Sequence, residues 1–262
     1  MDEKQNKSSV LLYFDVVMGV QMLGVDEAGR GPVIGPLVVC SLCIPETDYG
    51  LLDSIGVDDS KKLSRKKRKR VADAIMEFIN DEKWSLGVRI SSALEIDANS
   101  INSNLNSLEI NLFVDSILRC ANEDYAGVIY ADACDVDEQR FGSRLREKLG
   151  NSLNDWEIIS KHGMDGKNLV TGAASIVAKV IRDKEIEDLE EELGMEIGSG
   201  YPSDPKTIDA VIELCRGKLP HESIRWSWAT TSKVWKDLGK GNPPTRNYDG
   251  QITMESKIDD WG

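Results

Sequence analysis

The chain has 262 residues, of which 40% are hydrophobic, and a formal net charge of −13. This length can bury a sizeable core, and no apolar run approaches the roughly 20 residues that a membrane-spanning helix needs, so we expect a cytoplasmic protein that does not enter membranes. The net negative charge argues against attraction of nucleic acid by the chain as a whole, because polyanions repel. Binding of nucleic acid would therefore depend on how the basic residues are distributed.

The first predicted element is a strand over residues 22–26, which leads into two adjacent carboxylates, Asp26 and Glu27. Neighbouring residues of a strand point to opposite faces, so these carboxylates can share one metal cluster only if the strand ends or twists there. The glycines of Gly29-Arg30-Gly31-Pro32 favour such an ending and let a ligand approach the backbone amides, and Arg30 can bind a phosphate. The pattern suits metal-assisted phosphate chemistry; the alternative is a solvated acidic turn.

A second strand is predicted over residues 35–43, with no helix between it and the first, which favours a mixed sheet over a wholly parallel one. Cys40 and Cys43 form a lone C-x-x-C inside this strand. The chain has five cysteines, an odd number, and this pair has no second pair or histidine nearby. We therefore interpret it as a core feature with reduced thiols, rather than as a metal site.

A basic helix is predicted over residues 64–80, with Ser64 as its N-cap and an apolar stripe that includes Val71 and Ile75. Its first turns belong to the dense basic run of residues 61–70. Such a helix could hold a nucleic-acid backbone, and the alternative is a solvated helical face. A strand over residues 84–90 and a helix over 104–121 follow.

Two further carboxylates come after predicted strands. Asp132 directly follows a buried strand over residues 126–131, at a position typical of α/β active sites. Asp165 lies in a polar loop after the strand over 156–160, and taken alone it is more readily explained as a turn residue. Helices are predicted over 138–149 and 172–193, so strands and helices alternate as in an α/β protein.

The C-terminal third contains the loop that carries Tyr201 and two predicted helices, Thr207 to Cys215 and Ser232 to Leu238. Gly, Pro and Asn residues from 239 to 250 predict a flexible linker. The expected organisation is an N-terminal extension (1–20), a catalytic domain (21–205), a helical C-terminal part (206–238) and a flexible tail (239–262).

Several blocks of the sequence, taken together and in order, resemble ribonuclease HII, and most closely its archaeal form. The blocks are Gly24 to Pro32, Asp59 to Leu63, Asp132 to Val136 with Arg140 to Gly142, Ala173 to Asp183, and Gly198 to Pro205. The resemblance covers about residues 22 to 235. It implies the ribonuclease H-like fold, with a five-stranded mixed sheet flanked by helices and a helical C-terminal part.

The resemblance also implies the roles of individual residues. Four catalytic, metal-binding carboxylates fall at Asp26, Glu27, Asp132 and Asp165. The family's substrate-contacting residues fall at Gly29, Arg30 and Gly31, which read the 2′-hydroxyl and phosphate of the ribonucleotide, at Lys61, which contacts a phosphate, and at Tyr201, which stacks on the sugar of the following deoxynucleotide. The segment His162-Gly163-Met164-Asp165 departs from the family's usual His-Lys-Ala-Asp.

These residues imply an endoribonuclease that cuts the RNA strand of RNA–DNA hybrids and incises duplex DNA 5′ of a ribonucleotide. Four crowded carboxylates predict two divalent ions, Mg²⁺ or Mn²⁺, since hard cations prefer oxygen ligands. The alternatives are a hybrid-binding protein without catalysis and a DNA junction resolvase on the same fold. The default expectation is a monomer. Residues 255–262 resemble a degenerate box for binding a sliding clamp, with Ile258 and Trp261 as anchors, and the alternative for them is a disordered tail.

Overall fold

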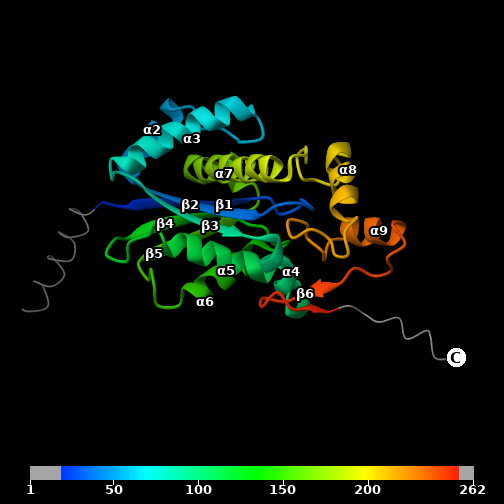
Figure 1. Ribbon diagram of the computed structural model, residues 1–262. Helices are drawn as coiled ribbons and strands as arrows, with labels where there is room; N and C mark the ends of the chain where they lie inside the picture. Colours follow the sequence, from blue (N-terminus) through cyan, green and yellow to red (C-terminus); the bar gives the residue numbers. More distant parts are fainter. Residues whose placement is uncertain (1–18, 254–262) are drawn as a thin grey trace, which may run out of the picture. The chain divides into compact units, whose positions relative to one another are not determined.

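A five-stranded mixed sheet organises the computed structural model, which describes residues 19–253. Its strands are β1 (Gln21–Ala28), β2 (Leu37–Pro45), β3 (Ser85–Ser91), β4 (Gly127–Asp132) and β5 (Trp156–Lys161). They lie in the order β3-β2-β1-β4-β5, and β1, β4 and β5 are parallel (Figure 1). The predicted α/β class and the five expected strands are confirmed.

Helices cover both faces of this sheet (Figure 1). They are α2 (Tyr49–Ser54), α3 (Arg65–Asn80), α5 (Leu105–Leu118), α6 (Glu138–Leu149) and α7 (Leu169–Leu193). On one face α7 approaches β1 so closely that a Cβ at Gly24 would lie 2.2 Å from the backbone nitrogen of Thr171, so only glycine fits there. On the other face, Ser116 of α5 donates to the carbonyl of Gly87 in β3 at 2.9 Å. Cover on both faces explains why every residue of β2 except the last is buried.

The basic helix α3 begins as the sequence predicts. The Ser64 hydroxyl accepts a hydrogen bond from the backbone nitrogen of Lys67, which caps one of the amides that the first turn leaves unpaired. Val71 and Ile75 are buried, so the apolar stripe faces the protein. This placement leaves the basic positions of the first turns on the outer side of the helix.

The chain forms two compact units, each assembled from several stretches of sequence. The first comprises residues up to Glu27, Val39–Arg89 and Glu109–Val180, and it contains most of the sheet. The second comprises Ala28–Val38, Ile90–Leu108 and the residues from Ile181 onward. Stretches that are far apart in sequence therefore pack together within each unit.

The second unit has a core of its own. Its elements are α4 (Ala93–Asn102), α8 (Pro205–Leu214), α9 (Ala229–Asp237), β6 (Thr245–Arg246) and β7 (Ile252–Thr253). Ile34, Val211 and Trp235 are among the buried side chains at its centre. The helices α8 and α9 correspond to the two predicted C-terminal helices, although α9 begins three residues earlier than expected.

Part of the segment predicted to be a flexible linker is anchored in the second unit. Arg246 of β6 is 5% exposed, and its Nε donates to Asp97 Oδ2 of α4 at 2.9 Å. The guanidinium also lies over the ring of Trp226, 4.4 Å from its centroid. A glycine- and proline-rich composition is therefore compatible with order here, because a buried ion pair holds the backbone.

Other features agree with the sequence or extend it. The short helix α2 and the helix α4 were not predicted; the Ser92 hydroxyl accepts from the backbone nitrogen of Glu95 and caps α4. Cys40 and Cys43 are buried free thiols, as interpreted.

Within residues 19–253, no helix has the length and apolar character that crossing a membrane requires. Most of the predicted N-terminal extension and the clamp-binding box lie outside the described residues.

Candidate active site

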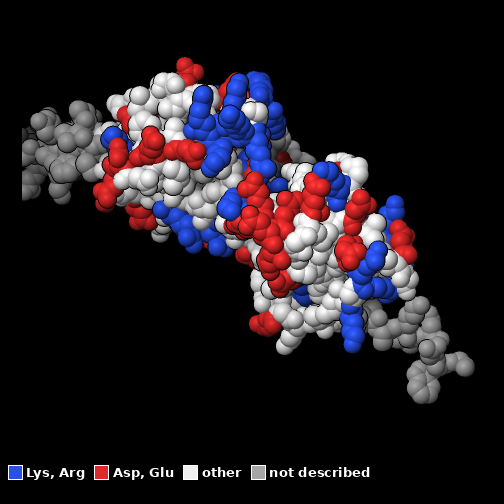
Figure 2. All heavy atoms as spheres, turned by 45° about the horizontal axis from the view of Figure 1, so that its top comes forward, with Lys and Arg blue, Asp and Glu red and all other residues white. Residues whose placement is uncertain are grey.

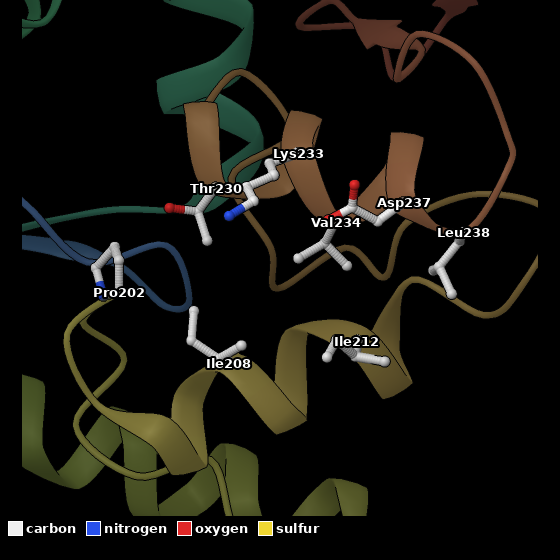
Figure 3. A pocket seen from close by; sticks show the side chains of 8 residues that line it. All are labelled: Pro202, Ile208, Ile212, Thr230, Lys233, Val234, Asp237 and Leu238. Atoms are coloured by element: carbon white, nitrogen blue, oxygen red, sulfur yellow. The ribbon is translucent and has the colours of Figure 1, made fainter.

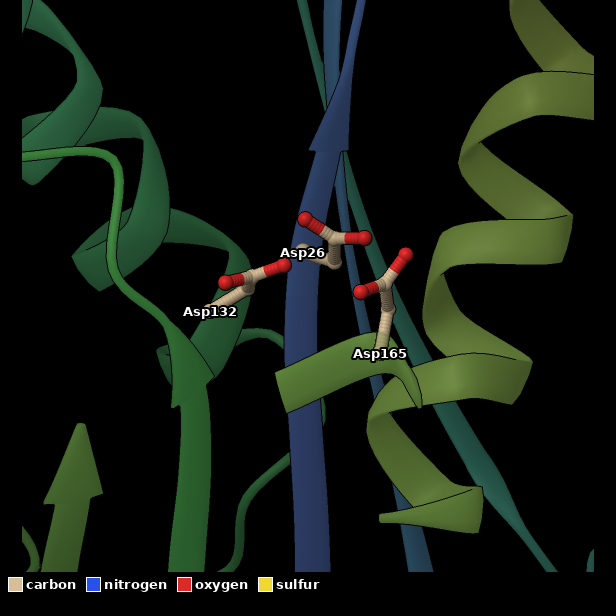
Figure 4. A group of neighbouring side chains, drawn as sticks. All are labelled: Asp26, Asp132 and Asp165. Carbon is tan, nitrogen blue, oxygen red and sulfur yellow. The ribbon is translucent and has the colours of Figure 1, made fainter. Parts of the chain in front are cut away.

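Three aspartates meet at the carboxyl ends of neighbouring strands (Figure 4). Asp26 lies near the end of β1, and Asp132 is the last residue of β4. The parallel register pairs Val25 with Ala131, so the next residues along the two strands, Asp26 and Asp132, are neighbours. Asp165 comes from the short 3-10 helix η2 (Met164–Gly166). One carboxylate oxygen from each aspartate lies within 4.8 Å of the others.

Two of the three carboxylates, those of Asp26 and Asp132, lie in an environment that opposes negative charge. Burial raises the pKa of Asp26, and the nearby Lys179 and a hydrogen bond from Ser175 partly offset that effect. Burial also raises the pKa of Asp132, to about 6, with the charges of Asp26 and Asp165 adding to it. Crowded, partly dehydrated carboxylates are costly unless a cation neutralises them. The donor set therefore fits a hard divalent cation such as Mg²⁺ or Mn²⁺.

Glu27, the fourth predicted carboxylate, does not belong to this group of three. The strand β1 continues to Ala28, so Asp26 and Glu27 keep the alternation of a strand. Burial raises the pKa of Glu27 well above its usual range, and the charges of Asp26, Glu109 and Asp132 add to this. Its Oε2 is buried and has no hydrogen-bond partner among the described residues. Such an oxygen is available to a cation on that side of the strand.

Two lysines compensate part of the negative charge. The predicted phosphate contact Lys61 places its Nζ 3.2 Å from Asp165 Oδ2, while 69% of its side chain remains exposed. Burial alone would lower the pKa of Lys61, but the hydrogen bond and charge of Asp165 raise it overall. On α7, Lys179 donates to Ser175 Oγ at 2.7 Å. Ser175 and Lys179 belong to the sequence block from Ala173 to Asp183. Their spacing of about one helical turn was the only sequence signal that both side chains face the aspartates.

The predicted ribose-reading turn and Tyr201 lie together in the second unit. Gly29 has φ +94°, and a Cβ there would come within 2.5 Å of the Arg182 side chain and of the Pro36 carbonyl oxygen, so the turn requires glycine. A Cβ at Gly31 would lie 3.4 Å from the Tyr201 ring, which is 40% exposed. The tyrosine is thus available for stacking beside the turn. The Arg30 guanidinium donates to Asn106 Oδ1 at 2.7 Å.

A basic surface forms on α3 in the first unit. Arg65, Lys66, Lys67, Lys69 and Arg70 are exposed, and Figure 2 shows lysine and arginine side chains gathered over this helix. Lys69 pairs with Asp73 at 3.7 Å, an exposed contact that contributes little. The acidic chain therefore carries a local positive surface, as the basic run predicts.

An apolar cavity of about 400 Å³ lies elsewhere, between α8 and α9 (Figure 3). Its lining is Pro202, Ile208, Ile212, Thr230, Lys233, Val234, Asp237 and Leu238. It contains none of the predicted catalytic or substrate-binding residues. Chemistry on phosphates needs convergent charged groups, so the aspartate cluster is a better candidate for the active site than this cavity.

Comparison with known proteins gives the family. The family model described as Ribonuclease HII matches residues 23–231. The chain belongs to the ribonuclease HII family. Ribonuclease HII is a type 2 ribonuclease H, so the chain is an enzyme, an endonuclease that acts on RNA–DNA substrates. Membership in a ribonuclease family favours this reading over a binding protein without catalysis and over a DNA junction resolvase.

Individual relatives support the same assignment. The ribonuclease HII of Methanocella arvoryzae is 43% identical over 218 residues, which cover 82% of this chain and 92% of the relative. The crystal structure of the ribonuclease H2 from Pyrococcus horikoshii OT3 is 37% identical, with a TM-score of 0.72, and the match covers 85% of this chain and 100% of that one. Ribonuclease HII from Archaeoglobus fulgidus, solved in a complex with PCNA, is 34% identical, with a TM-score of 0.68 and coverage of 81% and 96%. The predicted ribonuclease H-like fold and archaeal form are confirmed.

Proposed function

We propose that this ribonuclease HII hydrolyses the RNA strand of RNA–DNA hybrids and incises duplex DNA on the 5′ side of a single ribonucleotide, as a monomer that uses two divalent ions. The observation that carries the proposal is the convergence of Asp26, Asp132 and Asp165 within 4.8 Å at the ends of β1 and β4. In the proposed reaction water attacks the phosphorus and the bond from phosphorus to the 3′-oxygen of the preceding nucleotide breaks, which leaves a 5′-phosphate and a 3′-hydroxyl.

In the proposed mechanism, Asp26, Asp132 and Asp165 hold the divalent ions, with Glu27 as a further ligand through its buried Oε2. Bound Mg²⁺ or Mn²⁺ supplies an activated water and stabilises the charge that develops on the phosphate. The Nζ of Lys61, 3.2 Å from Asp165 and largely exposed, orients that carboxylate and contacts a substrate phosphate.

Substrate choice is proposed to depend on sugar identity. The Gly29-Arg30-Gly31 turn offers backbone amides to the 2′-hydroxyl, which distinguishes RNA from DNA. The exposed ring of Tyr201, next to Gly31, stacks on the following deoxyribose, which requires no particular base. The basic surface of α3 attracts the phosphate backbone without reading sequence.

The first test is cleavage of a labelled DNA duplex that contains one ribonucleotide, with Mg²⁺, with Mn²⁺ and with a chelator. We expect incision on the 5′ side of the ribonucleotide with either metal and none with the chelator, because the carboxylates alone supply no electrophile. An all-DNA duplex of the same sequence is the matched control and should stay intact.

Three other results would change the assignment. Cleavage of a long RNA–DNA hybrid without incision of the single-ribonucleotide duplex would reject the proposed role of Tyr201 at the junction. Cleavage of the all-DNA control would reject sugar reading by the turn. Incision that persists in the chelator after exhaustive metal removal would reject the metal role of the aspartates.

A sliding clamp is the proposed protein partner, with residues 255–262 as the binding segment. The support is the anchor pattern of Ile258 and Trp261, together with the relative from Archaeoglobus fulgidus solved in complex with PCNA. Deleting residues 254–262 spares the described hairpin β6–β7. We expect the deletion to abolish clamp binding, measured by calorimetry, and to leave incision of a short duplex unchanged. The double substitution Ile258→Ala, Trp261→Ala should act in the same way. Unchanged clamp affinity in both variants would dispose of the proposal.

A further inference from the structure

Arg225 is a buried cation whose partners are the carbonyl groups of the ribose-reading turn. Its side chain is fully buried. Its Nη2 donates to the carbonyl of Gly29 at 2.6 Å, and its Nη1 donates to that of Arg30 at 3.0 Å. Its Nε donates to Gly35 O at 3.1 Å. A planar guanidinium holds several acceptors at once in one geometry, so it fixes the path of the backbone between residues 29 and 35.

Trp228 extends the same arrangement to the third carbonyl of the turn. Its indole nitrogen donates to Gly31 O at 3.4 Å, and the Arg225 guanidinium lies over its ring, 4.8 Å from the centroid. The carbonyls of Gly29, Arg30 and Gly31 therefore all accept hydrogen bonds from one segment of the C-terminal part. Stacking on the indole keeps the guanidinium plane in place.

The direction of the carbonyls determines the direction of the amides. In a trans peptide the N–H points opposite to the C=O of the same unit. Since the Arg30 carbonyl points to Arg225, the N–H of Gly31 points away from it, and this N–H donates to no described residue. The exposed Tyr201 ring lies beside Gly31, 3.4 Å from the position of a Cβ there.

A second buried arginine packs against the same turn. A Cβ at Gly29 would lie 2.5 Å from Arg182 Nε, so Arg182 packs directly against the glycine. The Arg182 guanidinium also lies 5.5 Å from the centroid of the Tyr201 ring. The turn is therefore packed against Arg182 at Gly29 while Arg225 binds its carbonyl groups.

We propose that Arg225 is the positioning residue for ribonucleotide recognition: by binding the carbonyls of Gly29 and Arg30, it directs the amide of Gly31 toward the substrate 2′-hydroxyl, and Trp228 supports it. The inference rests on the proposed function, in which this turn reads the sugar. Arg225 does not contact the substrate in this arrangement. It acts through the turn, which is formed before substrate binds and so needs no reorganisation.

The test separates sugar reading from general binding in the metal-loaded enzyme. The KM for the single-ribonucleotide duplex is measured with Mg²⁺, and the all-DNA duplex of the same sequence serves as a competitive inhibitor with its own Ki. For Arg225→Lys, which keeps the charge and loses the fork, we expect the KM to rise about tenfold, the effect of one lost hydrogen bond, and the Ki to stay unchanged. Trp228→Phe keeps an aromatic ring and should raise the KM about threefold, since only one long hydrogen bond is removed.

Arg246→Lys is the matched control. Arg246 is also a buried arginine of the second unit, it also lies over a tryptophan ring, and it donates to Asp97 and to the carbonyl of Ile224 rather than to the turn. We expect a similar loss of thermal stability with an unchanged ratio of Ki to KM. A merely structural role of Arg225 would lower the active fraction, and hence kcat, without altering that ratio.

The outcomes distinguish the inference from the function on which it rests. If the wild-type enzyme binds both duplexes equally, sugar reading by the turn is wrong, and the role of Arg225 is wrong with it. If the wild type prefers the ribonucleotide and both Arg225→Lys and Trp228→Phe keep its ratio of Ki to KM, the positioning role is overturned while the proposed function stands. A reduced ratio in the Arg246→Lys control would also overturn it.

Discussion

Replacing Asp132 with asparagine is expected to lower turnover by more than about a hundredfold, since even partners of metal ligands contribute 10- to 100-fold. Asp132 ends β4 beside Asp26, and its carboxylate belongs to the three-aspartate group. The amide keeps the shape of the side chain but loses the charge that holds a divalent ion. Affinity for a hybrid should change little, because sugar and backbone contacts are assigned to other residues. Single-turnover cleavage and fluorescence anisotropy measure the two effects separately.

Asp155→Asn is the control for this prediction. Asp155 is exposed and precedes β5 in the first unit, so the substitution removes the same charge without touching the aspartate cluster. Activity close to that of the wild type is expected. If Asp132→Asn retained full turnover, the assignment of the catalytic centre to the three aspartates would be refuted; an equal loss in both variants would point to net charge instead.

Activity is expected to fall about tenfold for each pH unit below about pH 6, as a single essential carboxylate becomes protonated. Burial, together with the charges of Asp26 and Asp165, raises the pKa of Asp132 to about 6. A metal ligand must be deprotonated, so protons and divalent ions compete for this side chain. Raising the Mg²⁺ concentration should therefore move the midpoint to lower pH. The measurement is kcat/KM for the single-ribonucleotide duplex from pH 4.5 to 8 at two Mg²⁺ concentrations, with circular dichroism as the control for folding.

The stability of the metal-free protein should depend on pH in the opposite sense. The pKa of Asp132 is raised in the folded state, so the folded protein binds more protons than the unfolded chain between about pH 4 and pH 6. Its contribution to stability is fully present below pH 4 and is lost as the pH rises through 6. Because Asp132 is partly exposed, we expect at most about 2 kcal/mol. Asp26 and Glu27, whose pKa values are also raised, act in the same direction.

Chemical denaturation at pH 5 and pH 7, with and without Mg²⁺, measures this effect. In the metal-free protein, ionisation of the cluster should lower the free energy of unfolding between pH 5 and pH 7. Mg²⁺ should recover most of this loss at pH 7, because a ligand that binds only the folded state stabilises it. Asp132→Asn should show a smaller response to pH and to Mg²⁺, because Asp26 and Glu27 remain. A metal response of equal size in that variant would mean that the ions bind elsewhere.

Local sequence was sufficient for much of the fold. The apolar runs before Asp26 and Asp132 are strands, both acids lie at or near strand ends, and Ser64 caps α3. These features depend on side-chain alternation and on hydrogen bonds between residues that are close in sequence. Such local interactions require particular residue types at fixed spacings, which can be recognised in the sequence. Strand alternation also indicated that Asp26 and Glu27 point to different faces. Of the four acids that the resemblance suggested, three form a group, and Glu27 lies outside it but close enough for the charges of Asp26 and Asp132 to raise its pKa.

The tertiary structure alone decided which distant groups support the site. Only the parallel register of β1 and β4 makes Asp26 and Asp132 neighbours, and only the packing of α7 brings Lys179 to them. Arg225 lies 195 residues from the turn residue whose carbonyl it binds, and Arg246 lies 149 residues from Asp97. In sequence, a buried arginine looks like an exposed one. Its role depends on long-range contacts that form when the chain is folded. Such contacts produce no periodicity or fixed spacing in the sequence from which they could be predicted.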